Sequence, residues 1–168
     1  MVAKLQETLA GIQVEPPIIA GGLRVFPLRW DGQSSLAYIT LDDALKSGIL
    51  EITEVSGAGS VPDILASNKG DSMVLIIAGE ELIGAKQNRI LNTSVMVPAG
   101  SKTKIPVSCV EAGRWGYQSR SFRSEGSSAH SYLRRAMMED VCCCLESTGM
   151  HSSDQSAVWE EVDRKLSA

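Results

Sequence analysis

A succession of short apolar segments, separated by turns that carry glycine, proline or asparagine, most constrains the fold of this chain. Segments this short predict β-strands rather than helices, since several of them alternate between apolar and polar residues. Strands joined by short turns run antiparallel to their neighbours. The sequence therefore predicts a mainly β domain over residues 1–118, folded as an antiparallel β-sandwich or partial barrel. The predicted strands are residues 23–28, 36–39, 50–55, 73–77, 94–97 and 104–110.

One short helix is expected within this β domain, near residues 41–47. Thr40 is suited to cap free backbone amides, and the acids at Asp42 and Asp43 favour the positive end of the helix dipole. Gly48 supplies a left-handed stop.

The pattern changes after Gly126, where apolar residues recur at the three- and four-residue spacing of a helix face. Gly149 ends this helix, and Asp154 is suited to cap a second one whose apolar residues recur every four positions. The sequence thus predicts a linker over residues 119–128 and a helical hairpin over residues 129–168, packed on the sheet. The expected fold class is α+β.

Charge and length exclude several classes of function. The chain has 168 residues and a net charge of −4, so it suits one domain with a helical appendage and lacks the positive face that double-stranded nucleic acid requires. It contains no apolar run of the roughly 20 residues that cross a bilayer, and its N-terminus lacks the apolar centre of a signal peptide. We therefore expect a soluble, cytoplasmic protein without a membrane partner. The sequence leaves a homo-oligomer open.

The cysteines and histidines predict neither a disulfide framework nor a metal site. Three of the four cysteines are adjacent, Cys142 to Cys144, and neighbouring helical residues point in different directions. The two histidines, His130 and His151, have no metal-ligand spacing and belong to no recognisable triad. We expect no cofactor and no metal.

The likeliest site lies in the polar stretch Gly79–Arg89, which follows the apolar run Met73–Ile77. Acids and cations placed between core-like segments favour a site, although a hairpin with solvated charges would share this pattern. Catalysis would fall to three residues, with an acid as base and the amine holding an anion. Ligand binding would fall to the two amides and the guanidinium that follow. The catalytic candidates are Glu80, Glu81 and Lys86, and the binding candidates are Gln87, Asn88 and Arg89.

Strand alternation also predicts how this stretch is oriented. If the chain is extended, one face holds Lys86, Asn88 and Ile90, and the other holds Gln87, Arg89 and Leu91.

A second candidate site spans residues 111–123, where arginines interleave with aromatic residues. Arginine pairs with phosphate or carboxylate, and an aromatic ring offers a stacking face for a base or sugar. The candidates are Arg114, Trp115 and Arg120. The alternative is a loop that its aromatic residues anchor to the core.

Three runs resemble an uncharacterised bacterial domain family that is named for its association with ADP-ribosylglycohydrolases and rhodanese-phosphatases. The runs are GEELIGAKQNRILN at residues 79–92, VPAG at 97–100 and IPVSCVEAGRW at 105–115, and the resemblance covers roughly residues 20–165. It implies no established activity, and only by association a role near ADP-ribose or NAD metabolism. Similar members usually continue past the second helix, so the resemblance implies a compact or a shortened form.

Three hypotheses on function follow. The first is a module that binds a nucleotide-like or ADP-ribose-like anion. The second is a hydrolase or transferase acting on such a compound, and the third is a structural or assembly protein without small-molecule chemistry. The sequence leaves open whether the protein is an enzyme.

Overall fold

The computed structural model describes residues 2–32 and 36–167, and it divides the chain into two units, residues 1–36 and 37–168. The division follows the chain, so the two C-terminal helices belong to the same unit as the large sheet. In the part of the chain that is described, no helix is long and apolar enough to cross a membrane.

The first unit consists of a helix and two small antiparallel ribbons, with no buried residue among those described. The strand predicted over residues 23–28 is two short strands, because Pro27 has no N–H to donate to a ladder. One strand pairs on each side of this break, β3 with β2 and β4 with β1. The elements are α1 (Val2–Ala10), β1 (Gln13–Val14), β2 (Ile18–Ala20), β3 (Leu23–Val25) and β4 (Leu28–Arg29).

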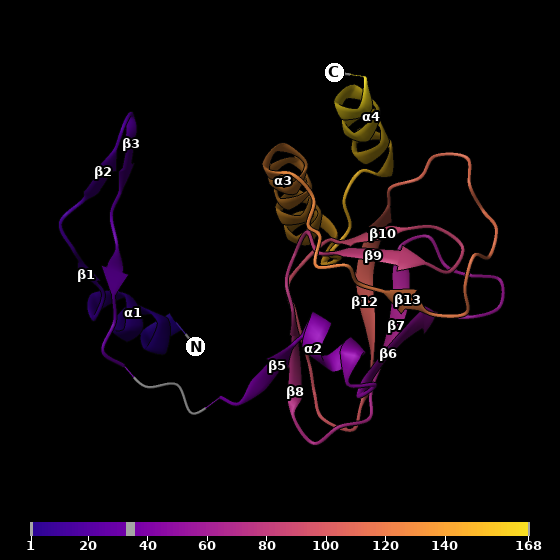
Figure 1. Cartoon of the computed structure of the whole chain (residues 1–168), viewed down its shortest axis with the longest axis horizontal. Helices are drawn as coiled ribbons and strands as arrows, with labels where there is room; N and C mark the ends of the chain where they lie inside the picture. The colour runs from indigo at the N-terminus through magenta and orange to yellow at the C-terminus, as the bar shows by residue number, and fades with distance from the viewer. Residues whose placement is uncertain (1, 33–35, 168) are drawn as a thin grey trace. The chain divides into compact units, whose positions relative to one another are not determined.

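The second unit is built around a six-stranded antiparallel sheet in the order β13-β9-β10-β12-β7-β6 (Figure 1). A bridge between Thr53 on the last strand and Ser121 beside the first brings the two edges together. The sheet is therefore a nearly closed barrel, which confirms the predicted α+β class and the partial barrel. Its strands are β6 (Leu50–Glu54), β7 (Asp63–Asn68), β9 (Glu81–Gly84), β10 (Arg89–Leu91), β12 (Lys102–Cys109) and β13 (Phe122–Arg123). Strand β13 lies within the stretch expected to be a linker.

A smaller sheet in the order β11-β8-β5 departs from the expected antiparallel pattern. Strand β5 (Tyr38–Thr40) pairs in parallel with β8 (Met73–Ile76), while β11 (Val95–Val97) pairs with β8 antiparallel. A parallel pair needs a long crossover, and α2 (Leu41–Lys46), β6 and β7 supply it.

Helix α2 forms where the sequence predicts it, and its Leu41 and Ala44 are fully buried. Its start differs in one detail. The Thr40 hydroxyl donates to the Asp43 carboxylate at 2.8 Å rather than capping a backbone amide.

The apolar residues form two cores in this unit. The barrel core contains Ile52, Ile64 and Ile105, each with no exposed surface. The second core lies between the outer face of the sheet, at Ile90, and the helices α3 (Ser131–Thr148) and α4 (Gln155–Leu166), which both lie on one side of the β9–β10 hairpin (Figure 1). The hairpin β9–β10 thus has a barrel on one face and helices on the other.

The two helices begin and end at the residues expected to cap them. Gly149 ends α3 in the left-handed conformation, with a φ of +74°, and the Asp154 side chain accepts from the amides of Ser156 and Ala157 at the start of α4.

We expect Ile105→Ala to lower the free energy of unfolding by about 2–5 kcal/mol, because it opens a cavity in the barrel core. Urea denaturation at equilibrium measures this loss. The control is Lys104→Ala, an exposed neighbour on the same strand, which should change stability little. Equal losses for both variants would contradict the assignment of Ile105 to the core.

Candidate functional site

A charged pair occupies the inside of the barrel. Arg89 begins β10 on the face that points to the barrel core, and its side chain has no exposed surface. Its guanidinium lies 3.5 Å from the carboxylate of Glu54 at the end of β6, which is 3% exposed. Removing either charge leaves the other buried and unpaired, so the pair holds β6 and β10 in place.

The same guanidinium binds the loop that follows β6. It donates to the carbonyl oxygens of Ser60 at 3.0 Å and Val61 at 2.9 Å, and to the Cys109 sulfur on β12. Arg89 Nε has no hydrogen-bond partner among the described residues. Burial raises the pKa of the Cys109 thiol, against the effect of the Arg89 charge, so this thiol is held in its neutral form.

A tight turn brings a second cation to this cluster. Gly84 and Ala85 have φ values of +119° and +45°, and the reversal directs Lys86 back over the barrel. Lys86 Nζ donates to the Ala58 carbonyl at 2.5 Å, and its backbone amide donates to Glu54 at 3.3 Å. Lys86 therefore lies beside Arg89, and the extended alternation expected from residue 86 onward holds only within β10.

This cluster has an excess of positive charge. Lys86 is 9% exposed and, within residues 2–32 and 36–167, forms no ion pair. Among the described residues, Glu54 is the one carboxylate that forms an ion pair in this cluster, and its partner is Arg89. An uncompensated buried cation favours a nearby anion.

Two aromatic rings from the second candidate segment cover the cations. The Lys86 amine lies 5.3 Å from the Trp115 ring centroid and 5.0 Å from that of Tyr117, and the Arg89 guanidinium lies 5.6 Å from Trp115. These are cation–π distances. The two candidate segments therefore meet in space, and Trp115 lies over both the Lys86 and the Arg89 side chains.

Arg114 is engaged in a separate ion pair beside this cluster. Its Nε donates to the Glu111 carboxylate at 2.8 Å, and its Nη2 reaches the Asn88 side-chain oxygen at 3.3 Å. Burial alone would raise the pKa of Glu111, but the hydrogen bonds from Arg114 and the Asn88 amide, with the Arg114 charge, hold it below its ordinary value. Arg114 and Asn88 thus shape the loop.

Gln87 has one free acceptor in the same region. Its Nε2 donates to the Glu111 carbonyl at 2.6 Å, while its Oε1 is buried without a partner among the described residues. A buried unsatisfied oxygen is costly and calls for a water or a ligand.

A cavity of about 720 Å³ opens beside the cluster. Arg120 lines it together with Glu54, the carboxylate of the Arg89 pair, and Tyr117, one of the two rings over Lys86. Hydroxyl, amide and backbone groups complete its wall, from Thr53, Ser56, Gly57, Gln118 and Ser119.

Glu80 and Glu81 lie elsewhere. Glu80 accepts from the Ile77 amide at 2.7 Å within a turn, and Glu81 accepts from the Ser127 hydroxyl at 2.7 Å. Glu81 pairs with Ile90, so it faces the helices while Arg89 faces the barrel. The three catalytic candidates are therefore not brought together, because Lys86 belongs to the barrel side.

Sequence reasoning missed Glu54, the acid at the centre of the cluster. Leu50, Ile52 and Glu54 share one face of β6, and the first two are buried apolar residues. A single acid in the inward register of a strand is the signal that could have found it. The described residues contain no group of three or more metal-binding side chains.

Comparison with known proteins gives one match. Residues 11–168 match the model of the ARG and Rhodanese-Phosphatase-superfamily-associated Protein domain. The comparisons with curated proteins and with solved structures found no match.

We expect Glu54→Ala to lower the free energy of unfolding by about 3–5 kcal/mol, because it leaves the buried Arg89 guanidinium without its carboxylate. Urea denaturation measures the loss. The matched control is Glu51→Ala on the same strand, since Glu51 pairs with Lys69 at the surface and its loss should be much smaller. Similar losses in the two variants would show that the buried Glu54–Arg89 pair contributes no more to the free energy of unfolding than the surface Glu51–Lys69 pair does.

A pH dependence follows from Glu80. Burial raises the pKa of Glu80, the Asp42 charge adds to the rise, and the hydrogen bond from Ile77 opposes it. A raised pKa means that the folded state binds more protons, so Glu80 lowers stability as pH rises through the folded pKa. Glu80→Gln removes this contribution. We therefore expect the variant to lose less Tm than the wild type as pH rises through the weakly acidic range, measured by thermal denaturation at several pH values. An identical dependence of Tm on pH in the two proteins would contradict this.

Proposed function

Because the chain belongs to the ARPP-1 family, the ARG and Rhodanese-Phosphatase-superfamily-associated Protein domain, we propose that it binds a nucleotide-like or ADP-ribose-like anion at the Arg120 cavity. The observation that carries the proposal is the positive excess of Lys86 and Arg89 over Glu54, whose carboxylate lines this cavity. The family name supports the choice of an ADP-ribose-like ligand only by association.

The charges at the cavity suit phosphate oxygens. Arg120 is exposed and lines the cavity, so its planar guanidinium is free to pair with a phosphate through two hydrogen bonds. The buried cations add a field that salt screens less than it screens a surface charge. The anion is therefore attracted by one exposed guanidinium and by the field of two buried cations.

The aromatic cover suits a base or a sugar. Trp115 is 47% exposed and Tyr117 is 55% exposed, although both rings contact a cation. Stacking of a base on an aromatic ring contributes about 1–3 kcal/mol. The cavity volume of about 720 Å³ lies in the range of small-molecule sites.

Binding is favoured over turnover at this site. Glu54 is the carboxylate that lines the cavity, and it already accepts from Arg89 and from the Lys86 amide. A base that abstracts a proton needs a free oxygen aimed at the substrate. The hydrolase or transferase hypothesis would therefore need a different base from Glu80 or Glu81.

The test is a titration with ADP-ribose, AMP and inorganic phosphate, followed by calorimetry and tryptophan fluorescence. We expect Arg120→Gln to weaken ADP-ribose binding roughly tenfold, the worth of one charge-assisted hydrogen bond. Arg123→Gln is the control, because Arg123 is a nearby surface arginine that pairs with Glu125 and does not line the cavity.

Two outcomes would overturn the proposal. One is the absence of any heat or fluorescence change with all three compounds in the wild-type protein. The other is an equal loss of affinity in Arg120→Gln and Arg123→Gln. Chromatography of ADP-ribose after incubation with the wild type separates the two readings of the site, because product formation would support an enzyme.

A further inference from the structure

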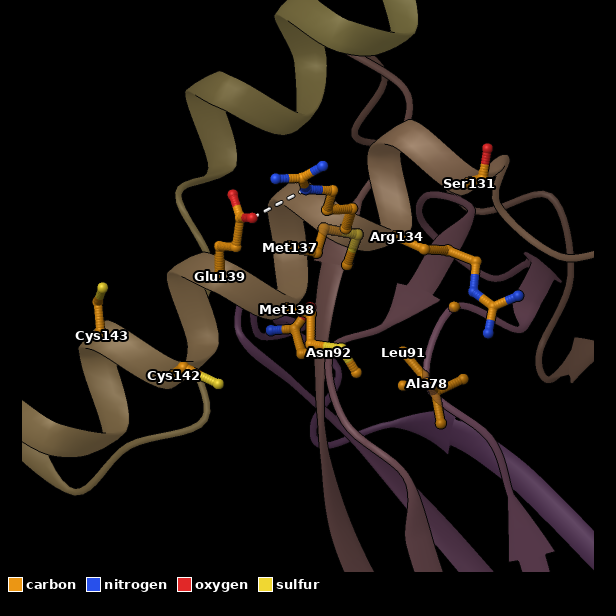
Figure 2. Close-up of a pocket in the computed structure, with 12 residues that line it drawn as sticks. Ala78, Leu91, Asn92, Ser131, Arg134, Met137, Met138, Glu139, Cys142 and Cys143 are labelled. Carbon is orange, nitrogen blue, oxygen red and sulfur yellow. Dashed lines mark hydrogen bonds and ion pairs between the residues drawn. The ribbon is translucent and has the colours of Figure 1, made fainter. Parts of the chain in front are cut away.

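A second cavity, of about 610 Å³, lies between α3 and the ends of β8 and β10, and it shares no lining residue with the Arg120 cavity. One wall is a face of α3 formed at three- and four-residue spacing by Ser131, Arg134, Arg135, Met138 and Cys142. The opposite wall is formed by Ala78, Gly79, Leu91 and Asn92. The cavity is mostly apolar (Figure 2).

The exposed side chain of Arg134 adds a positive charge to the lining of this cavity. Among the described residues, the Arg134 guanidinium makes no hydrogen bond and no ion pair, whereas the adjacent Arg135 pairs with Glu139 at 2.9 Å. Figure 2 shows Arg134 extending from α3 away from the Arg135–Glu139 pair. Arg134 is thus free to receive an acidic group.

The Arg134 side chain packs directly against Gly79. Its φ is +88°, and a Cβ at this position would lie 2.8 Å from Cγ and Nε of Arg134. A side chain here would both strain the backbone and displace the arginine. The glycine that begins the polar stretch therefore lets Arg134 lie across the turn into the cavity.

The two ends of the cavity differ, with Arg134 at one end and Cys142 at the other. Arg134 and Cys142 are eight residues apart on one helix, which corresponds to about 12 Å. Figure 2 shows them at opposite ends of the lining, with Met138 and Leu91 between. Methionine adapts its shape to apolar ligands.

From this geometry we propose that the cavity binds an amphipathic acid, an elongated apolar molecule with one anionic head group. The head group pairs with Arg134 at the Gly79 end, and the apolar body lies along Met138 and Leu91 toward Cys142. A neutral apolar compound would leave the guanidinium without a partner and so binds more weakly. The volume fits one small molecule, within the range of such sites.

Cys142 supplies a local readout. It is exposed and lines the cavity, while Cys109 is buried, so a Cys143→Ser/Cys144→Ser chain leaves one reactive thiol. The experiment measures the rate at which iodoacetamide alkylates this thiol, with decanoate below its micellar concentration or with decanol. We expect saturable protection by decanoate and much weaker protection by decanol.

The arginine is tested in the same background. Arg134→Gln should weaken protection by decanoate roughly tenfold, since a charge-assisted contact is lost. Arg123→Gln, a surface arginine away from this cavity, should leave the protection unchanged. Circular dichroism of each variant checks that α3 is retained.

Equal protection by decanoate and decanol, or unchanged protection in Arg134→Gln, would overturn the proposal. A labelling rate that falls with protein concentration and ignores decanoate would also overturn it, and would assign this face to a second copy of the chain. This test and the ADP-ribose test can fail separately, because the two cavities share no lining residue and each test uses its own ligand and its own arginine variant.

Discussion

The buried guanidinium of Arg89 is the interaction on which the barrel end depends. It binds Glu54 on β6, the Ser60 and Val61 carbonyls in the next loop, and Cys109 on β12. Two strands and a loop therefore meet at one planar group. Because arginine has five donors in a fixed arrangement, it satisfies several buried acceptors that a lysine could not reach together.

Burying such a group is costly. A hydrophobic side chain of similar volume often fills such a space with equal or better stability. What the charged cluster supplies instead is an electrostatic asymmetry, because two buried cations lie close to one acid, Glu54, which also lines a cavity. Trp115 and Tyr117 shield this cluster from water without neutralising it. This asymmetry is the basis on which we propose that the site binds an anion.

Local patterns predicted the short helix, the C-terminal helices and many of the strands, because alternation and capping are properties of neighbouring residues. They did not predict β7 or β13. The parallel pairing of β5 with β8 could not be predicted in this way, since it depends on segments far apart in the chain. Alternation correctly placed Arg89 and Leu91 on one face and Ile90 on the other.

The candidate site was harder to predict for the same reason. Lys86 joins Arg89 only because Ala85 adopts a left-handed conformation, which is uncommon for a residue other than glycine. Glu54 is distant in sequence from both cations, so no local pattern linked them. Glu80 and Glu81 are close to the cations in sequence, but Glu80 is bound within a turn before β9 and Glu81 faces the helices.

The stretch from Gly79 to Arg89 thus contributes to two places with different chemistry. Its first residue leaves room for Arg134 beside an apolar cavity, and its last residues hold the charged cluster inside the barrel. The two places are separated along the chain, because Gly79 lies in the turn before β9 whereas Arg89 begins β10. The two cavities share no lining residue, so a change at either end of the stretch should affect one cavity and leave the other intact. One short segment thus contacts both Arg134, through Gly79, and the buried charged cluster, through Lys86 and Arg89.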